Sequence, residues 1–330
     1  MALTLLGALT IVAVLAGAAI GPLRIAPSAV VAAIGRALVG GVGSDTIDTV
    51  LFSIRLPRVG AAALVGICLA GAGAAYQTLF RNPLVSPDIL GVSTGAGLGA
   101  VVAILLSLPV AGIQFFGFLG GVATVGAVVG LAAAIRSQNQ LLVLVLSGIV
   151  VGALANSAIA LVKVLADPYD QLPAITFWLL GSLARVKAPD LLAAVPAMLA
   201  GLAPLIALRW RIGVLALGDD EARSLGVEAG PLRTVVIAAA TLITASAVAL
   251  CGVVGWVGLM VPHMTRLLVG PRFDRLLPAS LLLGAAFMVA VDTLARSAAR
   301  VEIPLGVLTA VVGAPIFIWL LARGRRVWAS

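Results

Sequence analysis

Reactive side chains are scarce in this sequence, and their scarcity excludes several classes of protein. The chain contains one histidine, two cysteines and two lysines among its 330 residues. It has no GxxxxGK[ST] loop and no HExxH motif, so it cannot hydrolyse ATP by the P-loop mechanism or form that zinc site. Cys68 and Cys251 lack metal-ligand spacing, and the lone His263 follows a proline. We therefore expect two inert core thiols, a packing histidine, no metal, no cofactor bound by this chain and no catalytic residue.

Apolar residues dominate instead. They make up 62% of the chain against 10% charged residues, and the mean hydropathy is +1.20. Apolar runs of about 20 residues recur, each long enough to cross about 30 Å of hydrocarbon as a helix. The sequence predicts an all-α polytopic membrane protein of nine or ten transmembrane helices, with residues 1–330 forming a single transmembrane domain. The predicted spans are 2–21, 59–77, 91–110, 115–135, 141–165, 191–208, 234–254, 256–269, 278–296 and 304–322.

The net charge of +8 fits a membrane protein better than a nucleic-acid partner. No stretch forms a basic face with interleaved aromatic residues. Arginines concentrate in the short loops of one side, which the positive-inside rule assigns to the cytoplasm. The first apolar run has no Lys or Arg before it, so we expect a retained span rather than a cleaved signal peptide.

Two polar interruptions flank the second predicted span. Arg55-Leu-Pro-Arg58 precedes it, and the Pro-bounded segment 80–93 follows it. Charged and polar groups are costly at membrane depth. These two points therefore indicate places where something docks or passes.

A third polar segment, residues 215–228, has the pattern of a short helix. Gly218 and Gly226 bracket it, and acidic residues follow Gly218, where a helix N-terminus favours negative charge. Ala222 and Leu225 are three positions apart and are predicted to form a small apolar face. Such a helix could press against a soluble motor protein.

Several motifs together resemble one family. They are Arg55-Leu-Pro-Arg58, Gln77 with Phe80-Arg-Asn-Pro-Leu84, Leu90-Gly-Val-Ser-Thr-Gly-Ala96, Trp178-Leu-Leu-Gly-Ser182, Gly255-Trp-Val-Gly-Leu-Met-Val-Pro-His263, and Glu302-Ile-Pro-Leu-Gly306 with Gly313-Ala-Pro-Ile-Phe317. The chain resembles, over about residues 50–323, the FecCD-type permease subunit of type II ABC importers for ferric siderophores, haem and vitamin B12. The resemblance implies ten spans, pairing with a second copy of the chain, and multi-pass insertion in the bacterial inner membrane. It also implies two ATPase subunits that carry ATP and Mg, and a periplasmic substrate-binding protein.

The resemblance assigns roles to residues at the outer surface. Arg55, Arg58 and Arg296 match the arginines that pair with glutamates of the binding protein, as bidentate guanidinium groups do well. Arg300 competes for this role, and Asp292 could pair with Arg296 within one helix.

The resemblance also assigns inner roles. Asn82 and Leu84 match a cytoplasmic gate, and a second gate falls in residues 137–141, at Gln140 and Leu141. The residues matched to ATPase coupling are Gly218, Asp219, Glu221, Ala222, Arg223, Leu225 and Gly226.

The resulting hypothesis is a permease that imports an iron chelate, haem or ferric siderophore, from periplasm to cytoplasm. Vitamin B12 is the alternative cargo. An ion-coupled secondary transporter is a further alternative; it needs ionisable residues within the membrane, and the only candidates are Asp292 and, near a span end, Lys163. A membrane enzyme would lack a catalytic cluster.

Overall fold

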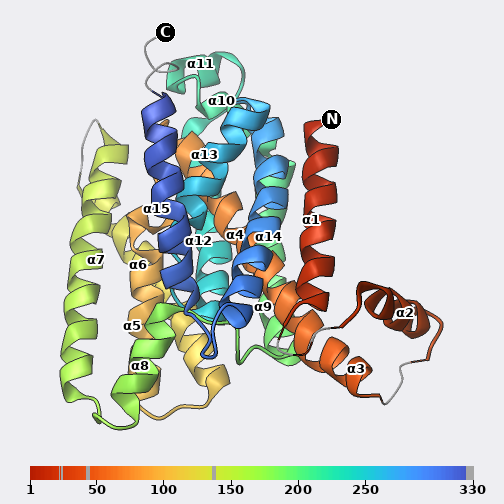
Figure 1. Ribbon diagram of the computed structural model, residues 1–330. Helices are drawn as coiled ribbons and strands as arrows, with labels where there is room; N and C mark the ends of the chain where they lie inside the picture. Colours follow the sequence, from red (N-terminus) through yellow and green to blue (C-terminus); the bar gives the residue numbers. More distant parts are fainter. Residues whose placement is uncertain (22, 24, 42–44, 136–138, 325–330) are drawn as a thin grey trace.

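A computed structural model describes the chain except residues 22, 24, 42–44, 136–138 and 325–330, and except the side chains of Leu38 and residues 320–324. The described part is helical and contains no strand, as the composition predicts. Most helices run side by side in one bundle (Figure 1). In chain order, the helices of the described part are α1 (Ala2–Ala19), α2 (Pro27–Leu38), α3 (Thr46–Thr49), the π-helix η1 (Val50–Arg55), α4 (Leu56–Leu79), the 3-10 helix η2 (Pro87–Leu90), α5 (Val92–Leu105), α6 (Val110–Ala134), α7 (Gln140–Leu165), α8 (Gln171–Leu180), α9 (Ala188–Ala207), α10 (Arg209–Leu215), α11 (Asp219–Ser224), α12 (Ala229–Cys251), α13 (Val257–Val269), α14 (Phe273–Ser297) and α15 (Leu305–Gly324).

Each of the ten predicted spans falls on a helix. In the described part, 7 helices are long and apolar enough to cross a membrane: α1, the continuous run Thr46–Leu79, α6, α7, α9, α12 and α14. The other three predicted spans fall on shorter apolar helices, α5, α13 and the described part of α15. The all-α polytopic fold is therefore confirmed.

Two of the predicted spans contain backbone that is not helical. The predicted span 91–110 is helical only over Val92–Leu105, and Gly91 before it has a φ of 74°, a conformation that glycine adopts readily. The non-helical residues 252–255, at the end of the predicted span 234–254, precede α13, which has 13 residues and rises about 20 Å. Irregular backbone at membrane depth is tolerated where it is buried in protein or lines a cavity. The starts of α5 and α13 are thus places to look for a site.

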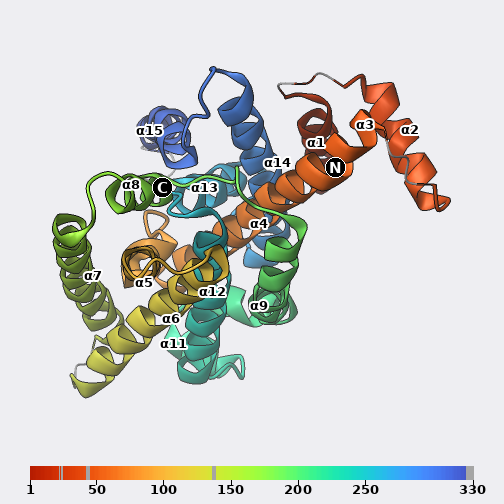
Figure 2. The same cartoon turned by 90° about the horizontal axis from the view of Figure 1, so that it is seen from below.

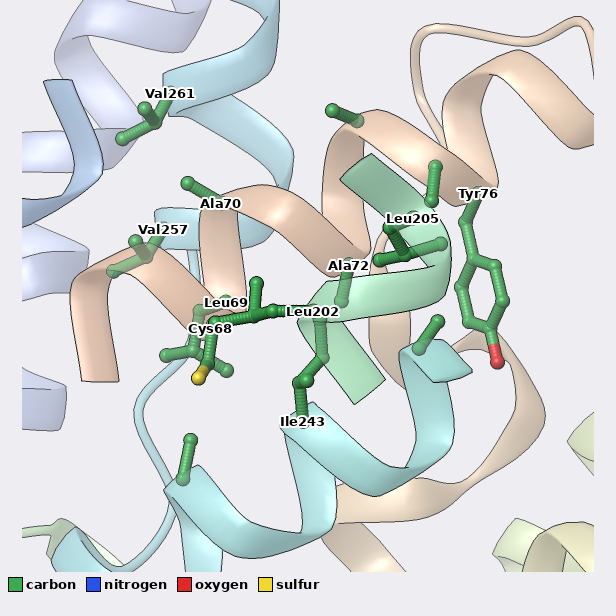
Figure 3. Packing of buried hydrophobic residues seen from close by; sticks show 14 of the residues in the cluster. Cys68, Leu69, Ala70, Ala72, Tyr76, Leu202, Leu205, Ile243, Val257 and Val261 are labelled. Atoms are coloured by element: carbon green, nitrogen blue, oxygen red, sulfur yellow. The ribbon is translucent and has the colours of Figure 1, made fainter. Parts of the chain in front are cut away.

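Helix α4 forms the centre of the bundle. It packs against α14, α12, α13 and α9, and it crosses between them in the view along the bundle (Figure 2). Nearly all of its side chains are buried. Figure 3 shows Cys68 and Leu69 of α4 packed near Leu202 of α9 and Ile243 of α12. Cys68 and Cys251 are both free and buried, as predicted.

Glycine allows α4 to approach its neighbours at backbone distance. A Cβ at Gly66 would overlap the carbonyl oxygen of Gly284 on α14, and one at Gly73 would overlap that of Gly258 on α13. Small residues permit such close packing in membranes, where van der Waals contact drives helix association. The glycines at these crossings therefore serve packing.

The bundle has two distinct ends. The N-terminus, α10 and α11 lie at one end, and α2, α3 and α8 lie at the other (Figure 1). We call these the inner and outer ends, because Arg209 and Arg211 in α10 mark the first as cytoplasmic by the positive-inside rule. Helix α4 has 24 residues and spans about 36 Å between them. Arg58 and Asn82 accordingly lie near opposite ends of one helix.

Candidate functional site

Arg55 ends the π-helix η1 and is almost completely buried, with 3% of its surface exposed. Its guanidinium donates to the carbonyl oxygens of Ala18 and Ala19, at 2.7 and 2.8 Å, and to that of Leu23. The last carbonyls of a helix have no partner within the helix and attract cations. Arg55 thus caps the C-terminus of α1.

Arg58, one turn further along, forms the centre of an ion-pair network at the outer end. Its Nε donates to Asp292 Oδ1 at 2.9 Å, and its two terminal nitrogens donate to the carboxylate of Glu302 at 3.0 and 2.8 Å. Arg296 Nε lies 3.4 Å from Asp292 Oδ2, and the Ser182 hydroxyl donates to Glu302 at 3.0 Å. The network joins α4, α14, the α14–α15 connection and the α8–α9 connection.

The three arginines predicted to dock a binding protein are therefore engaged inside the chain. Arg55 and Arg58 are buried, and the side chain of Arg296 is only 7% exposed. Arg36, Arg185 and Arg300 are the exposed arginines of this end in the described part, and Arg36 pairs with Asp48. The docking role of Arg55, Arg58 and Arg296 stays a prediction, and it requires these internal contacts to open.

The predicted gate residues lie near the inner end, Asn82 and Leu84 in the turn after α4 and Gln140 and Leu141 at the start of α7. Asn82 Oδ1 accepts a hydrogen bond from the Leu84 backbone at 2.9 Å, and the Leu84 side chain is exposed. Gln140 and Leu141 begin α7, where Asn139 Oδ1 caps the helix by accepting from the backbone of Leu142 at 3.2 Å. Residues 137 and 138 of the second gate lie outside the described residues. The gating roles stay predictions.

The segment matched to ATPase coupling forms α11 at the tip of the inner end (Figure 1). Gly218 and Gly226 have φ angles of 128° and 75°, which side chains rarely adopt. Asp219 pairs with Arg233 of α12 at 3.0 Å and fixes the helix to the bundle. Asp220 and Arg223, both exposed, pair at 3.5 Å along the helix.

One expectation for this segment is wrong. Ala222 and Leu225 do not form one apolar face, because Ala222 is fully buried in the core, where its carbonyl accepts from the Val227 backbone, whereas Leu225 is 51% exposed. The exposed apolar side chains here are Leu217 and Leu225. The spacing of these two residues along the chain does not show that one side of the short helix α11 packs against the rest of the bundle.

A cavity of about 470 Å³, lined by polar and apolar side chains, lies between α5, α7 and α8, near the irregular starts of α5 and α13. Ser93 donates to Asp88 Oδ1 in its lining. Asp88 lies in the polar segment 80–93, but its convergence with Asn156 does not follow from the sequence, because residues on separate helices meet only in the folded chain. The lining residues are Asp88, Ser93, Thr94, Gly97, Asn156, Ile159, Ala160, Lys163, Leu179 and Val253.

Gly91–Gly95 matches the G-x-S-x-G spacing of a hydrolase nucleophile elbow. Its Ser93 lies in the first turn of α5 and bonds to Asp88, not to a histidine. His263 lies on α13, buried and edge-on to Phe317 at a ring-centroid distance of 6.2 Å. This serine therefore lacks the base that such a nucleophile needs.

A helical bundle able to span a membrane, with a cavity between its helices and a short helix projecting from its inner end, fits a membrane transport subunit. The chain belongs to the FecCD transport family, whose model matches residues 9–323. This confirms the resemblance seen in the motifs. The chain is the permease subunit of an ABC importer of this type, a multi-pass membrane protein whose ATP hydrolysis belongs to a separate subunit.

Its relatives differ in the cargo that their names print. The chain is 40% identical over 278 residues to a molybdate import permease of Haemophilus influenzae, covering 83% of this chain and 82% of that one. It is 39% identical over 283 residues to a probable iron chelatin permease of Helicobacter pylori, with coverages of 86% and 85%. A cobalamin import permease of Halobacterium salinarum is 41% identical over 286 residues, with coverages of 86% and 76%.

A solved structure matches almost the whole fold. It is described as an inward-facing conformation of a metal-chelate type ABC transporter and aligns with a TM-score of 0.86 and 35% identity, covering 97% of this chain and 98% of that one. The fold and the family thus agree along nearly the entire sequence.

Proposed function

We propose that this permease imports a metal chelate from the periplasm to the cytoplasm of a bacterium. Among metal chelates, we place iron chelates ahead of the others as the cargo. The permease works as a homodimer in the inner membrane with two ATPase subunits and a periplasmic binding protein. The observation that carries the proposal is α11, a helix held between two positive-φ glycines and an ion pair to α12, with Leu217 and Leu225 exposed at the inner end. An ATPase subunit needs such a rigid, partly apolar contact surface to pass its movement to the membrane helices.

The cargo assignment rests on the family and its relatives. Haem and ferric siderophores are the iron chelates we propose, with cobalamin as the alternative. One relative is named for molybdate, so an inorganic oxyanion joins the candidates. The family's range includes all of these chemistries.

An ion-coupled carrier without an ATPase is less well supported. Its coupling group would be Asp292 or Lys163, and Asp292 is held between Arg58 and Arg296. A carboxylate in a buried ion-pair network is a poor candidate for binding and releasing a transported ion.

Reconstitution tests the proposal. The permease is co-purified with its ATPase and placed in proteoliposomes with the binding protein, and uptake of ferrichrome, haem and cyanocobalamin is measured with and without ATP. We expect ATP-dependent uptake that stops when the Walker lysine of the ATPase is substituted. Uptake that survives this substitution, or a permease that co-purifies with no ATPase, would overturn the proposal.

A matched pair of variants tests the role of α11. Leu225→Asp places a charge on the exposed apolar side of the inner end and should abolish ATPase co-purification. Tyr169→Asp, an exposed residue of the outer end, should leave it intact. Loss of ATPase in both variants, or in neither, would contradict the coupling role.

A further inference from the structure

The cavity between α5, α7 and α8, which we call the α5–α7 cavity, contains an unpaired positive charge. Lys163 on α7 is the only lysine or arginine among its lining residues. Within the described part of the chain, its ammonium has neither an ion-pair nor a hydrogen-bond partner. A lysine facing a cavity in a membrane bundle requires water or an anion to offset its desolvation.

The only carboxylate of the cavity is already engaged. Asp88 accepts hydrogen bonds from the hydroxyl and the backbone N–H of Ser93, at the start of the 14-residue helix α5. A helix N-terminus stabilises negative charge, and these two bonds hold the Asp88 carboxylate against the first turn of α5. The charge left facing the cavity is that of Lys163.

The remaining polar lining favours an oxygen-rich ligand. Thr94 and Asn156 can donate hydrogen bonds from a hydroxyl and an amide, and Gly97 and Ala160 leave room beside them. The lining contains no histidine, cysteine, methionine or tyrosine to ligate a metal directly. These groups suit the outer oxygens of a chelate rather than its metal ion.

We propose that the α5–α7 cavity is an anion-selecting subsite of the transport path, in which Lys163 binds a carboxylate or another anionic oxygen of the cargo. The proposal rests on the proposed import function and narrows its cargo to anionic, oxygen-rich metal chelates. Neutral corrinoids are then poorer substrates. Asn156 and Thr94 orient the anion by hydrogen bonding.

A snorkelling role for Lys163 is the competing explanation. Lys163 lies two residues before the end of α7, and a long lysine side chain can reach from there to the membrane surface. A snorkelling ammonium would be as accessible with cargo present as without it. The two roles therefore differ in whether an anion protects the amine.

The scarcity of lysine makes this difference measurable. The assembled importer in lipid nanodiscs is treated with an amine-acetylating reagent, and the modification of Lys163 and Lys187 is followed by mass spectrometry. Lys187, exposed at the start of α9 and outside the cavity, is the internal control. Ferric citrate is the anionic probe and cyanocobalamin the neutral one.

Ferric citrate should slow acetylation of Lys163 about tenfold at roughly ten times its dissociation constant, and should leave Lys187 unchanged. High salt should weaken the protection, because it screens the charge interaction. Equal protection by cyanocobalamin would overturn the proposal. So would a Lys163 that reacts equally with and without ferric citrate, or that fails to react in the empty importer.

Transport by two variants separates the charge of Lys163 from its size. Lys163→Gln should lower uptake of an anionic chelate about tenfold, the lower range for a hydrogen bond to a charged group, and Lys163→Arg should restore most of it. If wild-type importer shows no ATP-driven uptake of any cargo, the proposed function fails; if it transports but Lys163→Gln transports anions normally, only this inference fails.

Discussion

At the scale of single residues, Arg58 depends on partners that are remote in sequence. Asp292 and Glu302 lie 234 and 244 positions away, yet both accept hydrogen bonds from its guanidinium. A buried charge is tolerated when it is paired and hydrogen-bonded, and removing one partner is costly. The network therefore holds α4, α14 and the α14–α15 connection together only while it is complete.

Asp292→Asn should destabilise the permease by about 3 kcal/mol, because Arg58 and Arg296 would lose the buried carboxylate between them. Thermal unfolding of the detergent-purified protein measures the loss. Glu302→Gln is the control, since the Glu302 side chain is 27% exposed and water can replace part of its contact. Its cost should be about 1 kcal/mol or less. Equal melting of Asp292→Asn and wild type would contradict a structural role for the network.

At the scale of elements, α4 is the central helix of the bundle, and its position depends on glycine residues. Gly66 and Gly284 let α4 and α14 cross at backbone distance, and Gly73 does the same for α4 and α13. The two ends of α4 lead to the arginine network and to the Asn82 turn. A shift of α4 against α14 would therefore move both predicted docking and gating residues.

Gly66→Ala should destabilise the bundle by about 2 kcal/mol, because its Cβ overlaps the Gly284 backbone and forces the helices apart. The change is measured as a lower unfolding temperature and reduced monodispersity in detergent. Gly126→Ala on α6 is the matched control, since a Cβ there meets open space and alanine is the better helix former. Equal unfolding temperatures and monodispersity of the two variants would contradict the prediction that close packing of α4 against α14 stabilises the bundle.

At the scale of the whole molecule, the ends of the bundle determine which partners can meet it. The inner end carries α10 and α11, and the outer end carries α8 and the α7–α8 connection with Tyr169 (Figure 1). An importer of this orientation meets its motor at one end and its cargo at the other.

Cysteine labelling in cells that express the permease alone checks this orientation. Tyr169→Cys should react with a membrane-impermeant maleimide from outside, and Ser224→Cys on α11 should react only after permeabilisation. The wild type is the control and should stay unlabelled, because Cys68 and Cys251 are buried. The reverse labelling pattern would invert the assigned topology and the direction of transport with it.

Much of the fold was predictable, whereas the site was predictable only in part. Long apolar runs place the helices because a bilayer demands continuous apolar helical segments. The pairing of Asp292 with Arg296 was foreseen because it is local to one helix. The contact of Glu302 with Arg58 and the burial of Ala222 were not foreseen, because neither follows from spacing along the chain.

The sequence by itself therefore determined a polytopic helical membrane protein, its family and the absence of a nucleotide loop, since hydropathy, composition and motifs are local properties. Only the tertiary structure decided that the outer arginines are internally paired and that Lys163 faces a cavity with Asn156 and Asp88. These features depend on which faces of distant helices meet. The physical reason is packing, because side-chain partners across a bundle are selected by shape and distance and not by position in the chain.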